Sequence, residues 1–342
     1  DKMKLMRTED AVGQVLCHDI TQIIKGVTKD AVFRKGHIIT EEDIPVLLSV
    51  GKDHIYIWEN NENMLHENDA AKILYDMCAN EHMTPSEIKE GKIELIAECD
   101  GLLKVDTERL NAVNALGEMM IACRHGNFPV KKGDKIAGTR IIPLVIEKEK
   151  MERAKKAAGE EPIFELIPFK KMKAAIVNTG NEVFYGRIKD TFTPVIIEKL
   201  NEYGAEVVGH VVSDDNHEHI TAAIQKFLDE GVDMVLCTGG MSVDPDDRTP
   251  LAIKNTGAEI VTYGAPVLPG AMFLLSYYGE KKRPVIGLPG CVMYAKRTIF
   301  DLVLPRIVAG EILKKADMDT LGEGGLCLNC PVCTFPNCGF GK

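Results

Sequence analysis

Hydrophobic and polar positions follow different patterns in the two halves of the chain. Between residues 171 and 310, short apolar runs alternate with longer amphipathic stretches, which predicts β-strands that alternate with α-helices. The run 233–238 (DMVLCT) is apolar throughout, as expected for a strand of a parallel sheet with both faces covered. This alternation predicts right-handed βαβ crossovers and an α/β fold, a three-layer αβα sandwich with a mostly parallel sheet.

Turn and cap residues indicate where these elements start and end. We expect strands at 171–179, 206–212, 233–238, 258–263, 272–278 and 284–288. The pairs Thr193-Pro194 and Thr249-Pro250 each predict a helix start, with threonine as N-cap and proline at the first helical position. These two helices run to Glu202 and to just before Gly257; two others span 216–230 and about 293–308.

The first half predicts a mixed, β-rich region of shorter elements. Strand-like runs lie between residues 11 and 58 and between 92 and 146, and helical spacing occurs at 41–51 and 68–80. Nine of the fourteen residues at 147–160 are charged, which predicts a solvated helix or a linker. We therefore expect an N-terminal region of one or two subdomains at 1–146, a charged helix or linker at 147–170, the αβα domain at 171–310 and a cysteine-rich tail at 311–342.

Composition narrows the class of protein. The 342 residues carry a formal net charge of -10, which argues against a nucleic-acid binder that depends on a basic face. No run reaches the roughly 18–20 apolar residues of a membrane span. The opening DKMKLMRTED lacks the apolar core of a signal peptide. We therefore expect a cytoplasmic protein with a small-molecule ligand and without nucleic-acid or membrane partners.

Glycine-rich and acidic loops follow the predicted strands of the second half. Ligands of such folds bind at the carboxyl ends of the strands, where loops lead into helices. Glycine turns let backbone N–H groups approach a phosphate, and clustered carboxylates suit a hydrated divalent cation such as Mg²⁺. The candidate binding residues are Thr179, Gly180, Asn181, Glu182, Asp190, Thr191, Asp214, Thr238, Gly239, Gly240, Ser242, Asp246, Thr249, Pro269, Gly270, Pro289 and Gly290.

These loops resemble those of the molybdopterin-binding domain family of molybdenum cofactor biosynthesis, which includes MogA-type adenylyltransferases and MoeA-type insertases. In chain order, the resemblance rests on NTGNEV (178–183), GRIKDT (186–191), VVSDD (211–215), TGGMS (238–242), DDRTP (246–250), APVLPG (265–270) and GLPG (287–290). It covers about residues 172–308. It implies a MogA-like fold, molybdopterin, its adenylylated form or the molybdenum cofactor as ligand, and a homo-oligomer that works with molybdoenzymes or other proteins of cofactor biosynthesis.

The first half resembles the insertases more loosely. AVGQVLCHDI (11–20) is similar to their opening segment, and KGHIITEEDIPVLLSVG (35–51) is similar to the segment that follows it. The long DGYA-containing stretch of the insertases is missing from this chain. The resemblance therefore implies an insertase-like N-terminal region that is atypical of its family.

Departures from the family pattern keep three functions open. Residues 269–272 (PGAM) and 289–292 (PGCV) replace the family's P-G-K-P and P-G-N-P, so a lysine suited to an oxyanion such as molybdate is missing. Residues 244–247 (DPDD) instead resemble the competence-damage-inducible (CinA) branch, which is associated with metal-dependent hydrolysis of nucleoside diphosphate sugars.

The first function is a molybdotransferase- or adenylyltransferase-like enzyme, the second a non-enzymatic carrier or sensor of the cofactor, and the third a metal-dependent nucleotide pyrophosphatase. For an enzyme, Asp247 and Asp215 are the expected catalytic residues, acting on a phosphate or diphosphate with a bound cation.

Four of the ten cysteines lie close together near the end of the chain. Cys327, Cys330, Cys333 and Cys338 have the spacing C-x2-C-x2-C-x4-C, with glycine and proline between and around them. The first three spacings resemble those of [4Fe–4S] ferredoxins, whereas structural zinc sites use paired C-x2-C units. The tail therefore predicts an iron–sulfur or zinc site, with a reduced thiol tail as the alternative. The other six cysteines are expected to be buried apolar residues.

Overall fold

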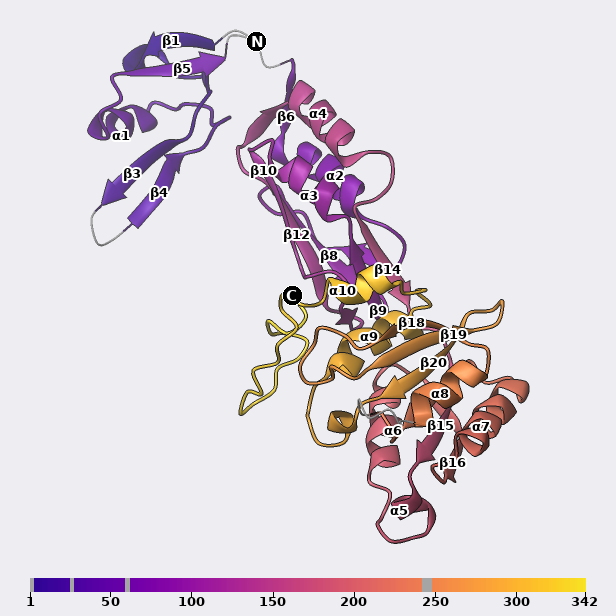
Figure 1. Ribbon diagram of the computed structural model, residues 1–342. Coiled ribbons are helices and arrows are strands. Elements are labelled where there is room, and N and C mark those ends of the chain that lie inside the picture. The colour runs from indigo at the N-terminus through magenta and orange to yellow at the C-terminus, as the bar shows by residue number, and fades with distance from the viewer. Residues whose placement is uncertain (1–2, 25–27, 59–61, 242–247) are drawn as a thin grey trace. The chain divides into compact units, whose positions relative to one another are not determined.

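The computed structural model describes residues 3–24, 28–58, 62–241 and 248–342. The chain forms two compact units (Figure 1). Unit 1 contains Asp1–Cys99, Leu103–Gly126 and Val130–Leu166, and unit 2 contains Asp100–Leu102, Asn127–Pro129 and Ile167–Lys342. In the described part of the chain, no helix is both long and apolar enough to cross a membrane.

A six-stranded sheet forms the centre of unit 2, in the order β16-β15-β17-β20-β19-β18. Its strands are β15 (Lys173–Thr179), β16 (Glu206–Ser213), β17 (Met234–Thr238), β18 (Glu259–Tyr263), β19 (Leu274–Tyr278) and β20 (Arg283–Leu288). Strands β15, β16, β17 and β20 run parallel, and β19 is antiparallel to both of its neighbours. The prediction of a mostly parallel sheet is confirmed.

Helices cover both faces of this sheet because its strands are apolar on both sides. Ala174 and Ile176 of β15 pack with helices α6 (Phe192–Glu202) and α9 (Ile299–Val308) in one core cluster. Ala175 and Val177 point to the other face and pack with α7 (His217–Asp229) and α8 (Arg248–Asn255). These are the three layers that the sequence predicts (Figure 1).

Two helix starts differ from the prediction. Helix α6 begins at Phe192, so Thr193 is inside the first turn and is not the N-cap. The acceptor there is the Asp190 carboxylate, which takes hydrogen bonds from the backbone N–H groups of Phe192 and Thr193. Helix α8 likewise begins one residue before Thr249.

The last predicted helix is shorter than expected at its start. Helix α9 begins at Ile299 and not near 293, because Thr298 and Asp301 form a reciprocal capping box there. Residues Gly290–Met293 form a separate 3-10 turn, η2. The short helices α5 (Asn181–Phe184) and α10 (Lys315–Asp319) complete unit 2 and were not expected from the sequence.

Unit 1 contains several small β-sheets, as the sequence predicts. Its first part has a sheet in the order β1 (Met3–Arg7), β5 (His54–Trp58), β2 (Val15–Leu16), a hairpin of β3 (Ile20–Ile24) and β4 (Thr28–Phe33), the turn η1 (Thr8–Asp10) and helix α1 (Asp43–Ser49). A second core joins the sheet β10 (Met119–Cys123), β12 (Lys135–Ile141), β8 (Lys92–Ala97), β7 (Met83–Pro85) to helices α2 (Glu67–Cys78), α3 (Thr107–Asn114) and α4 (Lys148–Ala158). The other pairing within unit 1 is β13 (Val145–Glu147) with β6 (Met64–His66). The remaining sheet of the chain has the order β11 (Pro129–Val130), β9 (Gly101–Val105), β14 (Phe164–Pro168).

The charged stretch before unit 2 is helix α4. Met151, Ala154 and Ala158 are buried on one face of α4, and the charged residues occupy the rest. Of the two predicted alternatives for this stretch, a solvated helix and a linker, the structure forms an amphipathic helix of unit 1. Helix α3, in contrast, was not expected from the sequence.

A buried ion pair ties α6 to the start of α9. The Lys199 Nζ atom lies 2.8 Å from both carboxylate oxygens of Asp301, whose side chain is only 2% exposed. Asp301 also accepts hydrogen bonds from Arg297 and from the Thr298 backbone N–H. Removing one charge from such a pair leaves the other charge buried without compensation.

We therefore predict that Asp301→Asn lowers the free energy of unfolding by about 3–5 kcal/mol. The control is Glu202→Gln, which removes a half-exposed partner of Arg297 and should cost less than about 1 kcal/mol. Urea unfolding followed by circular dichroism measures both changes. Equal effects of the two substitutions would contradict the importance of the buried pair.

Candidate functional site

The described parts of the loops predicted to bind the ligand lie at one edge of the unit 2 sheet. Strands β15, β16, β17 and β20 are parallel, so their carboxyl ends meet at the same edge. Because β18 and β19 are antiparallel to each other and β19 opposes β20, the connection between β18 and β19 returns to that edge as well. The topology alone therefore brings the strand-end candidates among the described residues to a common edge.

Buried threonines join the ends of β15 and β17 at this edge. Thr179, Thr238 and Thr249 are 5%, 0% and 0% exposed. The Thr179 hydroxyl donates to the Thr238 carbonyl over 2.8 Å and lies 3.1 Å from the Thr249 hydroxyl, which itself donates to the Gly239 carbonyl over 2.7 Å. Thr179 and Thr249 each have one hydroxyl proton, so two protons are shared among these three contacts. This arrangement holds the start of α8 against the glycine turn after β17.

The two glycines of that turn are required by geometry. Gly239 and Gly240 have φ angles of +82° and +62°, a region that glycine adopts at low cost. A side chain on Gly239 would overlap the carbonyl oxygen of Thr179, and a Cβ on Gly240 would lie 2.8 Å from the Thr249 hydroxyl oxygen. The backbone after β17 therefore approaches β15 more closely than any other residue type allows.

The loop after β15 contacts the loop after β16. Gly180 has a φ of +143° and precedes the short helix α5, and its N–H donates to the Ser213 carbonyl over 3.1 Å. The Asn181 side chain accepts a hydrogen bond from the Asp215 N–H over 3.1 Å. Glu182 is exposed at the same place. Predicted residues from two different loops are thus adjacent.

A polar network extends from β17 through β15 to α6. Buried Asn178 accepts a 2.9 Å hydrogen bond from Thr238 and its side chain also bonds to Asp190. Asp190 accepts from the Thr193 hydroxyl, which lies 3.2 Å from the His210 Nε2 atom. Burial raises the pKa of Asp190, but the hydrogen bonds from Thr193, Asn178 and Phe192 outweigh it, so the net pKa is lowered. Asp190 is therefore an ionised acceptor at neutral pH.

Asp214 is also engaged in local contacts. Its carboxylate lies 2.9 Å from the His219 Nδ1 atom and accepts a hydrogen bond from the Asn216 N–H. The hydrogen bond with His219, followed by that from Asn216, lowers the pKa of Asp214. Its neighbour Asp215 is half-buried. Asp214 thus organises the start of α7, next to its N-cap Asn216.

The two Pro-Gly loops are shaped by apolar and backbone contacts. Gly270 has a φ of +122° and packs so closely on Ile299 that a side chain would overlap it, and the Ile299 N–H donates to the Pro269 carbonyl. Pro289 precedes η2, from which the Met293 sulfur atom accepts a hydrogen bond from the exposed Thr191 hydroxyl over 2.8 Å. The residues Pro269, Gly270, Pro289, Gly290 and Thr191 are therefore placed around the same edge.

The sequence of this αβα domain matches a known protein family. The sequence profile of a family described as "Probable molybdopterin binding domain" matches residues 175–309. Residues 175–309 belong to this domain family. A second profile, for a domain of unknown function, matches residues 5–59.

Relatives of this molybdopterin-binding domain are modestly similar to the chain. The chain is 28% identical over 163 residues to the molybdopterin molybdenumtransferase of Synechococcus elongatus, a match that covers 45% of this chain and 38% of the relative. It is 34% identical over 90 residues to a CinA-like protein of Mycobacterium avium, covering 26% of this chain and 21% of the relative. The chain thus spans well under two thirds of the length of either relative.

Solved structures are similar at lower identity. The tungsten cofactor synthesizing protein MoaB from Pyrococcus furiosus has a TM-score of 0.34 and 20% identity, with 40% of this chain and 93% of that chain covered. The molybdopterin biosynthesis MoeA protein from Pyrococcus horikosii has a TM-score of 0.34 and 17% identity, with 90% and 75% covered.

Not every predicted site residue can be located in the molybdopterin-binding domain. Ser242, Asp246 and the predicted catalytic Asp247 lie outside the described residues, so their roles stay predictions. Conversely, Asn178 and His210 belong to the polar network and were not among the candidates. An asparagine inside an otherwise apolar strand was the available signal for Asn178, since a buried amide requires partners.

The four tail cysteines are free thiols. Cys330 and Cys333 are exposed, whereas Cys327 and Cys338 are half-buried against the core of unit 2. Within residues 3–24, 28–58, 62–241 and 248–342, no three His, Cys, Asp or Glu side chains are grouped so that they could hold a metal ion. The predicted metal site of the tail is therefore not assembled in this structure.

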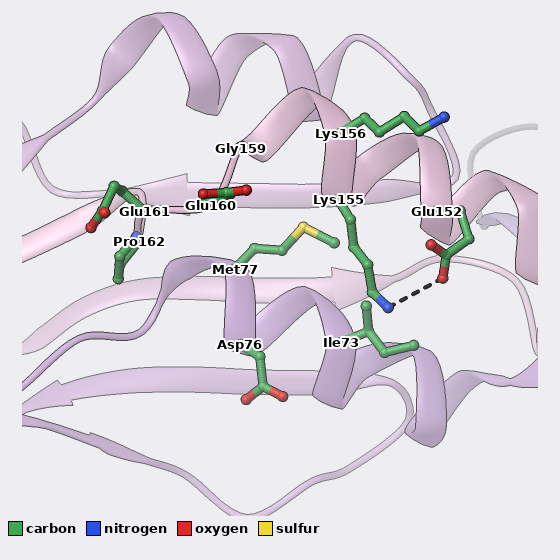
Figure 2. Close-up of a pocket in the computed structure, with 10 residues that line it drawn as sticks. All are labelled: Ile73, Asp76, Met77, Glu152, Lys155, Lys156, Gly159, Glu160, Glu161 and Pro162. Carbon is green, nitrogen blue, oxygen red and sulfur yellow. Dashed lines mark hydrogen bonds and ion pairs between the residues drawn. The ribbon is translucent and has the colours of Figure 1, made fainter.

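Unit 1 has a pocket of its own, of about 640 Å³, between α2 and α4 (Figure 2). Four carboxylates and two lysines line it, and Lys155 bonds to Glu152 over 3.2 Å. Pro162 also lines the pocket, and its backbone carbonyl accepts a hydrogen bond from Arg109. Every residue that lines this pocket belongs to unit 1, and none of the described site candidates is among them.

We predict that Gly239→Ala lowers the free energy of unfolding by roughly 2 kcal/mol or more, because it combines overpacking with an unfavourable positive φ. The matched control is Gly290→Ala, since a Cβ on Gly290 has no atom within 4 Å. Thermal and urea unfolding measure the difference. A Gly239→Ala protein as stable as the control would contradict the close approach to Thr179.

The lowered pKa of Asp190 predicts a pH dependence. Stability from a carboxylate with a depressed folded pKa is present above its unfolded pKa of about 3.9 and is lost as the pH falls through the folded value. Asp190→Asn should therefore cost about 1 kcal/mol at pH 7, and this difference from the natural protein should shrink as the pH falls below about 4. Urea unfolding at several pH values tests this, and a pH-independent difference would contradict it.

Proposed function

We propose that this protein binds molybdopterin or its adenylylated form at the carboxyl edge of the unit 2 sheet and handles it in molybdenum cofactor metabolism. The observation that carries the proposal is the Gly239–Gly240 turn, held by the Thr179, Thr238 and Thr249 hydroxyls beside the first turn of α8. Backbone N–H groups of glycine turns next to helix starts suit a phosphate. The family match over residues 175–309 supports the pterin as the group attached to it.

Aromatic side chains beside these loops support a flat ligand. Phe184 and Tyr185, at the end of α5, are 46% and 60% exposed, and their rings meet edge to face at 5.1 Å. Ile188 on the same connection is also exposed. Exposed rings of this kind bind planar heterocycles by stacking. We assign the pterin ring to this side and its phosphate to the glycine turn.

Binding without molybdate insertion agrees best with the loops. The Pro269–Gly270 loop continues into Ala271 and Met272 and contains no lysine, and Pro289–Gly290 continues into Cys291. Both loops nevertheless keep a defined shape through Ile299 and η2. We therefore favour a carrier or sensor of the cofactor over a molybdotransferase.

Metal-dependent pyrophosphate cleavage is the second candidate. It is favoured by the similarity to CinA-like proteins at 34% identity and by the DPDD segment at 244–247. On this alternative, Asp246, Asp247 and Asp215 bind the cation and water attacks the phosphorus atom. The two candidates share one binding site and differ in turnover.

We predict that Tyr185→Ala weakens molybdopterin binding by about 1–3 kcal/mol, the usual contribution of one stacked ring. Tyr56→Ala is the control, because Tyr56 is a similarly exposed ring in unit 1. Isothermal titration with molybdopterin, its adenylylated form and ADP-ribose, with and without Mg²⁺, gives the affinities.

The same titrations distinguish the candidates. Pterin binding without any product supports the carrier, whereas Mg²⁺-dependent cleavage of ADP-ribose supports the pyrophosphatase. Failure to bind either pterin form overturns the proposal, and equal affinities of the two tyrosine variants overturn the assignment of the ring.

A further inference from the structure

The segment after α10 forms a loop that is fixed at its start. Leu326 forms a parallel bridge with Leu268. The Leu268 N–H donates to the Gly325 carbonyl, and the Cys327 N–H donates back to the Leu268 carbonyl, both over 2.9 Å. The first tail cysteine is therefore tied to the residue that precedes Pro269 and Gly270.

The same loop is fixed at its other end. The Gly341 N–H donates to the Gly324 carbonyl over 2.7 Å, and Phe340 is buried in the core of unit 2 at 5% exposure. Phe335 contacts both Phe340 and Phe128. Residues 325–340 thus form a closed loop whose ends meet, in the manner of an Ω-loop.

All four tail thiols lie on this one closed loop. Cys327 and Cys338 lie near its fixed ends and are half-buried, and Cys330 and Cys333 are exposed between them. Residues 328–333 form neither helix nor strand, and the described backbone hydrogen bonds nearest to them are those of Cys327, Asn337 and Cys338. No described backbone–backbone hydrogen bond of residues 328–333 would have to break for the two exposed thiols to move.

Positive side chains surround the loop. The Lys296 Nζ atom lies 3.4 Å from the Pro331 carbonyl, and the Lys342 Nζ atom donates to the Pro336 carbonyl over 2.6 Å. Arg297 lies over the Phe335 ring at 4.9 Å. These cations can offset part of the negative charge of a centre with four thiolate ligands.

We propose that Cys327, Cys330, Cys333 and Cys338 together bind one soft metal centre, through four thiolates, when residues 328–333 fold inward. Each thiol loses its proton as it binds. Iron–sulfur clusters and zinc share this ligand chemistry. Because Cys327 is hydrogen-bonded to Leu268, formation of the centre stabilises the Leu268–Leu326 bridge beside the Pro269–Gly270 loop.

The test uses the full-length chain, reduced and under anaerobic conditions. One arm titrates Zn²⁺ and the optical probe Co²⁺. The other supplies ferric iron, sulfide and a thiol reductant, which provides the electrons that bring a four-iron cluster to its mixed ferrous–ferric state. The expected result is one equivalent of Zn²⁺ or Co²⁺ with thiolate charge-transfer absorption, or about four iron and four sulfide ions per chain. Either positive arm supports the site and identifies its metal.

Variants keep the test specific. Cys330→Ser and Cys333→Ser change exposed residues and should weaken metal binding at least about tenfold, a loss that even outer-shell changes cause. Cys123→Ser and Cys291→Ser are the controls, because these half-buried cysteines lie outside the tail. Absence of metal in both arms, or unchanged binding in the Cys330→Ser/Cys333→Ser double variant with native unfolding behaviour, overturns the proposal. Pterin binding is measured separately, so its failure is distinguishable.

Discussion

The close approach of the Gly239 backbone to the Thr179 carbonyl is the constraint on which the rest of the site depends. Only glycine leaves room for that oxygen, and the positive φ at Gly239 and Gly240 turns the chain away from β17 at once. The Thr249 hydroxyl then reaches the Gly239 carbonyl and holds the start of α8 there. One steric contact therefore sets the positions of two strand ends, one turn and one helix start.

Much of this arrangement could be predicted from the sequence, because it depends on local rules. A T-G-G motif after an apolar strand predicts a tight turn, and the strand–helix alternation predicts that such turns meet at one edge. The parts that could not be predicted depend on contacts between segments that are far apart in the sequence. The apolar run of β19 does not encode its direction, and antiparallel pairing with β20 emerges only in the sheet.

The starts of α6 and α9 illustrate the same limit. Asp190, Thr191 and Thr193 are all good cap residues, and the Thr-Pro pair favoured Thr193. In the structure Thr191 is the N-cap, and the Asp190 carboxylate accepts the N–H groups of the first turn. Asn178 and the Thr193 hydroxyl hold that carboxylate in place. At α9, Asp301 is both a capping residue and the partner of buried Lys199, a role that sequence spacing does not reveal.

Electrostatics limits what the acidic loops can do for an anionic ligand. The carboxylates of Asp190 and Asp214 accept hydrogen bonds from backbone N–H groups and lie close to His210 and His219 respectively. Their oxygens therefore stabilise helix starts, and a phosphate beside them depends on the glycine turn for compensation. The shape of the Pro269–Gly270 loop comes from Gly270 packing on Ile299 and does not need a cation. Loop shape and loop charge are thus independent here, so a chain without a lysine in this loop can keep the loop's shape.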